Sequence, residues 1–206
     1  VKIIYDACPR MKIFLSSSSS IGLESEAMKN LAGRYFLREI RPLSFPEFLE
    51  MKGKRKYAET PGIWEKELVE EAEKYMLRSF PEIINLAEKL LVKDYLRSMV
   101  VDKIVRDDVP SIFRNVNTEL LYKLIEIFFS NPGMHLDMDE LSTSLRISKR
   151  TLINHVNYLE FCYLIKRVRN FRPSIMSASR KLPKIYAGWW NLLYIHTENE
   201  DRIIEN

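Results

Sequence analysis

One segment near the C-terminal end carries side chains suited to contacting nucleic acid. Arg150 and Asn154 are residue types that make paired hydrogen bonds to guanine and adenine edges in the major groove of DNA. A helix that begins beside Arg150 also offers free backbone N–H groups, which bind phosphate. The side chains of this segment that we expect to face double-stranded DNA are Lys149, Arg150, Thr151, Asn154, His155 and Tyr158.

Two short helices are predicted to position these side chains. Asp137 or Asp139 can cap the first helix and Ser148 can cap the second, because a side-chain oxygen there accepts a hydrogen bond from a free N–H group. A tight turn at residues 146–147 joins them. The second helix then projects one side outward. Apolar residues at spacings of three and four predict one buried cluster of Leu141, Leu145, Ile147, Leu152, Val156 and Leu159.

A β-hairpin is predicted to follow the second helix. Residues 164–169 alternate between apolar and charged side chains, as a half-buried strand does, and residues 184–186 are the expected partner strand. The cations expected on this hairpin suit the phosphate backbone of DNA; they are Arg169, Arg172, Arg180 and Lys181. A helix–turn–helix that is followed by such a hairpin is a winged helix, so we expect a winged helix here.

The distribution of charge favours the same interpretation. The chain has a formal net charge of +4, but residues 146–186 hold ten basic residues and one acid, Glu160. A basic block between near-neutral stretches is typical of a surface that faces phosphate. The alternative is a solvated basic surface without a partner. The ten basic residues are Arg146, Lys149, Arg150, Lys166, Arg167, Arg169, Arg172, Arg180, Lys181 and Lys184.

The chain offers no residue arrangement that supports catalysis. It contains no Gly-x-x-x-x-Gly-Lys-Ser/Thr phosphate loop and no acidic pair at the end of an apolar strand. Its three histidines lie far apart in the sequence, without companions at metal-ligand spacing, and Cys8 and Cys162 do not make a disulfide framework. We therefore expect no catalytic residue, no metal and no cofactor.

The sequence also lacks the signals of a membrane protein. No apolar run approaches the roughly 18 residues that a membrane span needs. The first residues break off their apolar stretch at once, unlike a signal peptide. We expect a cytoplasmic protein without membrane contact.

The elements before the winged helix are less sharply marked. Residues 12–15 and 34–40 have the pattern of short strands, with a helix expected over 23–32 between them. Ser44 can cap a short helix that contains Phe48. The other expected elements are an exposed polar loop at 52–62, a helix from 63 to about 76, a helix that starts at Pro81, a helix from 91 to about 105 that stops before Pro110, and a helix at 119–129 capped by Thr118.

Three motifs, taken in order, resemble a known family. They are Ile13-Phe14-Leu15 with the serines that follow, Leu31-Ala32-Gly33-Arg34-Tyr35, and Pro42-Leu43-Ser44-Phe45-Pro46-Glu47-Phe48-Leu49. They resemble the archaeal and bacterial AAA+-like ATPases that carry a C-terminal nuclease-like domain of unknown function. Later segments of the chain fall where those proteins have a Phe-Pro-Glu motif, a winged helix and a Lys-Ile-Tyr motif.

The resemblance covers the sensor strand, the lid-side helices and the winged helix of that family. The phosphate-loop and acidic-strand motifs, which precede the sensor strand in the family, do not occur in this chain. By the resemblance, Ser18 would face a nucleotide and Arg34 would contact phosphate. Without a phosphate loop, neither is expected to support hydrolysis.

We therefore expect a mostly α (α+β) protein that binds DNA and has no nucleotide hydrolysis of its own. One alternative is a protein–protein interaction module, which includes a homodimer. Another is one part of a split ATPase that a partner chain completes. The expected divisions are an ATPase-like α/β remnant at 1–50, a helical lid-like region at 51–115, a winged-helix domain at 116–190 and an acidic tail at 191–206.

Overall fold

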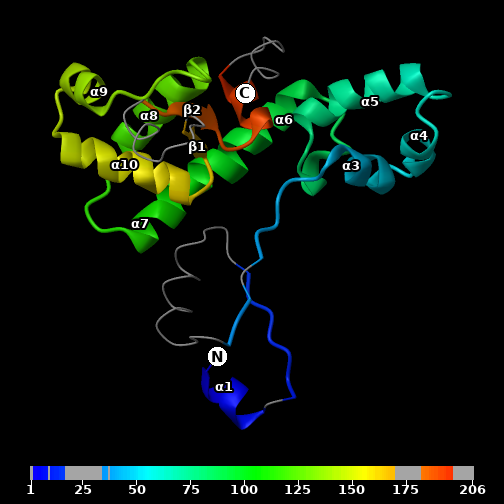
Figure 1. Ribbon diagram of the computed structural model, residues 1–206, viewed down its shortest axis with the longest axis horizontal. Coiled ribbons are helices and arrows are strands. Elements are labelled where there is room, and N and C mark those ends of the chain that lie inside the picture. Colours follow the sequence, from blue (N-terminus) through cyan, green and yellow to red (C-terminus); the bar gives the residue numbers. More distant parts are fainter. Residues whose placement is uncertain (1, 9, 17–33, 37, 170–181, 197–206) are drawn as a thin grey trace, which may run out of the picture.

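The computed structural model describes residues 2–8, 10–16, 34–36, 38–169 and 182–196, and these residues form a mostly helical protein with a two-stranded sheet (Figure 1). The expected mostly α class is confirmed. The elements are α1 (Lys2–Ala7), α3 (Phe45–Met51), α4 (Arg55–Glu59), α5 (Glu65–Leu77), the 3₁₀ helix η1 (Pro81–Ile83), α6 (Lys89–Tyr95), the π-helical η2 (Leu96–Asp102) and η3 (Ile104–Asp108), α7 (Val109–Ile112), α8 (Thr118–Ser130), α9 (Met138–Leu145), α10 (Lys149–Phe161), β1 (Ile165–Val168), β2 (Lys184–Ala187) and the 3₁₀ helix η4 (Trp190–Ile195).

The described residues before residue 42, here called the N-terminal arm, extend away from the helical body (Figure 1). The strands that we predicted at 12–15 and 34–40 are absent from the described residues of this arm. A strand needs a neighbour that accepts its hydrogen bonds and covers its apolar side, and Phe14 and Phe36 are instead 90% and 93% exposed. The helix expected at 23–32 lies outside the described residues.

Helices α3, α4 and α5 form a small unit at one end of the body. The predicted helix after Ser44 is confirmed, and the backbone N–H of Ser44 donates to Glu47 Oε2 at 2.7 Å. Phe48 and Leu49 are fully buried in a core of their own with Ile84.

The polar segment 52–62 is not only the exposed loop that we predicted, because it contains helix α4. Arg55 and Glu59 make an ion pair of 3.1 Å across one turn of this helix. Tyr57 stacks on Trp64, with 4.9 Å between ring centroids. The polar composition of the segment does not reveal these contacts.

A buried carboxylate ties this unit together. Glu71 on α5 is only 2% exposed, and its oxygens lie 2.8 Å from Lys54 Nζ, 2.6 Å from Lys74 Nζ and 3.4 Å from Lys52 Nζ. Burial by itself would raise the pKa of Glu71, but hydrogen bonds from Lys54 and Lys74 outweigh it and lower the pKa to about 2. Glu71 therefore remains charged at neutral pH and anchors the basic segment before α4.

The prediction of a helix that starts at Pro81 is wrong, since only the single 3₁₀ turn η1 forms there. The guanidinium of Arg78, a buried residue, donates to the carbonyls of Leu86 at 2.6 Å and Ala87 at 2.9 Å. These bonds hold the backbone of residues 86–87, which is not helical and separates η1 from α6.

The next helix also differs from the prediction, because it passes Pro110 and ends at Ile112. Helix α6 leads into π-helical turns, which directly precede α7. A proline ring clashes with the carbonyl four residues earlier in a regular α-helix, and the wider π turn leaves room for it.

One continuous apolar core runs from Leu77 to Ile195 and joins α6–α7 to α8–α10, the sheet and η4. The helix expected at 119–129 is confirmed as α8, although its cap is Asn117, whose side chain accepts from the N–H of Leu120, and not Thr118. Residues 191–195 belong to η4 and are buried, so the acidic tail does not begin at 191. Apolar side chains such as Leu192 are kept inside by the cost of exposing them.

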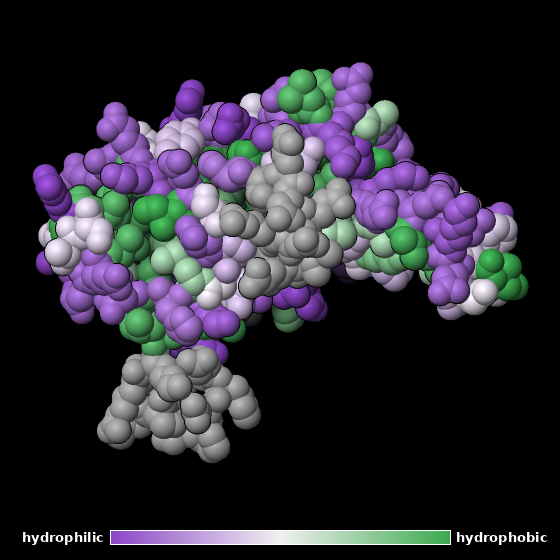
Figure 2. All heavy atoms as spheres, turned by 90° about the horizontal axis from the view of Figure 1, so that it is seen from above, coloured by the Kyte–Doolittle hydropathy of each residue, from purple (hydrophilic) through white to green (hydrophobic). Residues whose placement is uncertain are grey.

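The surface of this body is largely polar. Figure 2, a view from above, shows hydrophilic side chains over most of both ends, with apolar side chains in separate patches. In the part of the chain that the structure describes, no helix is long and apolar enough to cross a membrane.

Candidate nucleic-acid interface

The two helices α9 and α10 begin where their capping residues predict. Asp137 Oδ1 accepts hydrogen bonds from the N–H groups of Asp139 and Glu140 at 2.9 and 3.1 Å. Ser148 Oγ accepts from the N–H of Thr151 at 3.0 Å. Between the helices, Arg146 adopts the left-handed conformation with φ 54°, which ends α9 and turns the chain.

The buried side of this pair is formed largely as predicted. Leu152, Val156 and Leu159 of α10 are fully buried. The three residues expected to complete the cluster are half-buried and pack against the same core; they are Leu141, Leu145 and Ile147.

The hairpin pairs β1 with β2 in antiparallel register, with Lys166 opposite Tyr186 and Arg167 opposite Ile185. The backbone before α9 lies along the other edge of β2. The N–H of Gly133 donates to the carbonyl of Ile185 at 2.8 Å, and Ile185 donates to the carbonyl of Met134 at 3.0 Å. We did not predict this third segment, because it is too short to show alternation.

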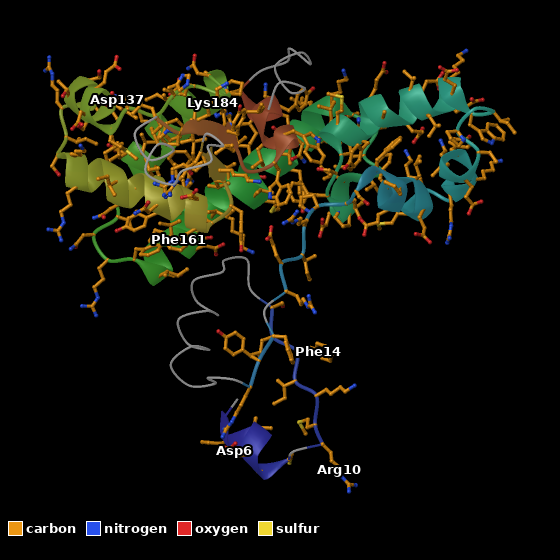
Figure 3. The ribbon with its side chains drawn as sticks, viewed as in Figure 1. Asp6, Arg10, Phe14, Asp137, Phe161 and Lys184 are labelled. Atoms are coloured by element: carbon orange, nitrogen blue, oxygen red, sulfur yellow. The ribbon has the colours of Figure 1, made fainter. Side chains whose placement is uncertain are left out.

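The outward side of α10 presents Arg150 and Asn154, both exposed. Within the described residues neither side chain has a hydrogen bond or an ion pair. Asn157 lies on the same side one turn later and is half-buried. It was missed from the sequence, although its spacing of seven from Arg150 was a signal that could have identified it. Figure 3 shows Phe161 at the end of this helix.

Two further predicted residues lie at the start of α10 and are engaged with their neighbours. Lys149 is exposed, and its Nζ lies 2.7 Å from the Asp139 carboxylate. The hydroxyls of Thr151 and Ser148 are 2.7 Å apart. An exposed ion pair of this kind contributes little to stability, so Lys149 can exchange Asp139 for a phosphate at small cost.

The prediction that His155 faces outward is wrong, because this side chain is 4% exposed. Its Nε2 is 3.1 Å from the backbone N of Asn117, and its Nδ1 is 2.8 Å from the carbonyl of Thr151. Tyr158 is half-buried and stacks on Phe113, with 4.0 Å between ring centroids. Both residues lie on the side of α10 that the chain before α8 covers.

The described cations of β1 and of the residue that follows it fall into two groups. Lys166 and Arg169 are exposed, and neither has a partner among the described residues. Arg167 instead forms an ion pair with Glu160, and its Nε lies 2.6 Å from Glu160 Oε2. Three cations expected on the hairpin lie outside the described residues; they are Arg172, Arg180 and Lys181.

One of the two residues assigned by resemblance, Arg34, belongs to the N-terminal arm. Ser18 lies outside the described residues. Arg34 donates to the Asp6 carboxylate at 2.8 Å, and the two side chains are 43% and 48% exposed. A contact of Arg34 with phosphate stays a prediction.

Comparison with known families gives two matches, which cover different parts of the chain. Residues 1–49, which include the N-terminal arm, match the AAA domain family. This match supports the relation to AAA-type proteins in general terms. Residues 69–188, which run from α5 to the end of the hairpin, match a domain of unknown function, DUF8612.

The similar curated proteins carry no assigned activity. An uncharacterised protein of Methanocaldococcus jannaschii is 28% identical over 205 residues, 94% of this chain and 45% of the relative. An uncharacterised protein of Haemophilus influenzae is 28% identical over 164 residues, 77% of this chain and 39% of the relative. The chain thus spans less than half the length of these relatives.

No solved structure matches the chain significantly. The assignment therefore rests on the match over residues 69–188, which is longer than half of the 206 residues. It takes in α6–α10 and both strands of the hairpin. On this match, the chain belongs to the family of the domain of unknown function DUF8612.

Proposed function

We propose that the protein binds double-stranded DNA through a winged helix formed by α8, α9, α10 and the β1–β2 hairpin. The observation that carries this proposal is the outward side of α10, where Arg150 and Asn154 are exposed and unengaged. Exposed cations of the hairpin, Lys166 and Arg169, lie in the segment that follows the same helix. Base-reading side chains next to cations for the phosphate backbone are what DNA requires.

The dimensions of α10 suit a major groove. Its 13 residues make a helix about 20 Å long, and the groove of B-form DNA is about 12 Å wide and admits a helix. Arg150 and Asn154 are separated by about 6 Å along the axis. This separation corresponds to roughly two base-pair steps of about 3.4 Å.

The test is a titration of the whole chain with a labelled duplex of mixed sequence at two salt concentrations. Because Lys166 is assigned to a phosphate, Lys166→Met should weaken binding to all sequences and reduce the salt slope by roughly one unit. The matched control is Lys66→Met, which removes an exposed lysine from α5, a helix at the other end of the body from α9 and α10 (Figure 1). Equal effects of the two variants, or binding without salt dependence, would favour a protein-docking module instead.

We propose as a second candidate that the N-terminal arm completes an AAA-type unit supplied by another chain, as in a split ATPase. Seven large apolar side chains of the arm are between 49% and 93% exposed: Ile3, Ile4, Met11, Phe14, Leu15, Phe36 and Ile40. Exposed apolar surface of this extent is typical of an interaction site. The match of residues 1–49 to the AAA domain family supports an AAA-type partner.

Its test uses the part of the longer M. jannaschii relative that this chain does not match. The two pieces should form a complex in size-exclusion chromatography, and Phe14→Asp with Phe36→Asp should abolish that complex. ATP binding is expected for the complex and not for the chain by itself. Micromolar ATP affinity of the isolated chain, or no complex at all, would contradict this candidate.

A further inference from the structure

Asn157 occupies the third position of the outward side of α10, after Arg150 and Asn154. Unlike the side chains of Arg150 and Asn154, the side chain of Asn157 is held by a hydrogen bond. Asn157 Oδ1 lies 2.9 Å from Arg167 Nη2, so the helix is connected here to strand β1.

The chemistry of this contact fixes the orientation of the amide. A guanidinium has only donors, so the group of Asn157 that faces Arg167 must be the carbonyl oxygen. The amide NH₂ is then turned away from Arg167. Asn157 therefore offers hydrogen-bond donors to whatever lies against this part of the helix.

Glu160 keeps Arg167 in place. The backbone N–H of Arg167 donates to Glu160 Oε1 at 3.2 Å, and Arg167 Nε donates to Glu160 Oε2 at 2.6 Å. The ion pair also cancels the charge of Arg167, which makes it a poor ligand for phosphate. A hollow of about 340 Å³ adjoins this network and is lined by Asn157, Glu160, Phe161, Tyr163 and Arg167.

We propose that Asn157 is a fixed hydrogen-bond donor that selects a base with a keto oxygen in the major groove, thymine or guanine, over cytosine. Arg167 and Glu160 are positioning residues for it. Thymine O4 and guanine O6 accept a hydrogen bond in the major groove, whereas cytosine presents its N4 amino group. The inference rests on the proposed binding of DNA.

Asn154 provides the contrast within the same helix. It has no partner among the described residues, so its amide can turn to give one donor and one acceptor to adenine. Asn157 cannot turn in this way while Arg167 holds its oxygen. The two asparagines should therefore impose different preferences at neighbouring positions of the site.

The test selects preferred sites for the whole chain from a randomised duplex library and repeats the selection with Asn157→Asp. The substituted carboxylate keeps an oxygen toward Arg167 and turns an acceptor outward. At one position of the site, the preference should change from thymine or guanine to cytosine or adenine. At this position the original protein should bind DNA with the preferred base about 5- to 100-fold more tightly than DNA with the disfavoured base.

Two further variants separate this inference from the proposed function. Arg167→Met should remove the preference at that one position and leave the affinity for mixed-sequence DNA within a few-fold. Lys166→Met should lower the affinity for every sequence and leave the preference unchanged. If DNA binding depends on salt but Asn157→Asp selects the same base as the original protein at this position, this inference alone is overturned. Absence of DNA binding overturns both.

Discussion

The imidazole of His155 and the backbone N–H of Asn117, 38 residues apart in the chain, are joined by a hydrogen bond of 3.1 Å. A backbone N–H can only donate, so Nε2 of His155 accepts, and Nδ1 carries the proton that it donates to the carbonyl of Thr151. This histidine therefore connects α10 to the start of α8.

Replacing His155 by Ala should destabilise the protein by about 1–3 kcal/mol, because the substitution removes a buried imidazole and its hydrogen bonds to Asn117 and Thr151. The matched variant is Asn154→Ala, at the neighbouring exposed position, which should stay within about 0.5 kcal/mol. Urea unfolding measures both. Equal stability of the two variants would contradict the role assigned to His155.

Leu152→Ala should cost about 2–5 kcal/mol, since Leu152 is fully buried and the substitution leaves a cavity. Leu145→Ala should cost less, because Leu145 is only half-buried at the edge of the same core. Denaturant unfolding of the two variants tests the order. A larger loss for Leu145→Ala would show that the register of these helices differs from the one described.

Glu71 should make the stability depend on acid pH. Its pKa in the folded protein is lowered to about 2 from an ordinary value of 4.5, so the folded state favours the charged form. The stability that it contributes is complete above about pH 4.5 and is lost as the pH falls toward 2.

Glu71→Gln should therefore lower the free energy of unfolding by about 1–3 kcal/mol at pH 7 and by less near pH 3. The three lysines around Glu71 are partly exposed, which keeps this loss moderate. Glu70→Gln, at the exposed neighbouring position, is the control. A loss for Glu71→Gln that does not change between pH 7 and pH 3 would be inconsistent with the lowered pKa.

Gly188→Ala should disrupt the end of the hairpin, because a Cβ at this position would lie 1.7 Å from the carbonyl oxygen of Tyr163. The close approach comes with a bond of 2.8 Å from the N–H of Gly188 to the carbonyl of Leu164. We expect a loss of about 3 kcal/mol or more. Gly62→Ala, where no atom lies within 4 Å, is the control for thermal unfolding. A melting temperature unchanged by Gly188→Ala would contradict the packing described here.

Local signals in the sequence predicted the C-terminal half well. Capping residues such as Ser148, and apolar spacings such as Leu152 to Val156, act within one or two turns and are readable from the chain alone. The predictions failed where the local structure depends on a residue that is distant in the sequence. His155 looks like an exposed helical residue until Asn117 is placed beside it. Arg78 binds carbonyls eight and nine residues later, in the non-helical backbone where we expected a helix.

The same limit applies to the candidate site. Arg150 and Asn154 could be identified from spacing and chemistry, and both are exposed. The fixed orientation of the Asn157 side chain could not be identified, because it depends on a hydrogen bond from Arg167 on the strand that follows the helix. The strands expected in the N-terminal arm required neighbours that the described residues do not contain.

The continuous core from Leu77 to Ile195 has a consequence for how the protein can be divided. A fragment cut at the predicted boundaries of 116 and 190 would lack the helices from α6 to α7 and all of η4 except Trp190. It would expose the apolar surfaces that these elements cover. The smallest piece that keeps this core intact is residues 77–195. Limited proteolysis should therefore release the arm first, and should leave α10 attached to α6.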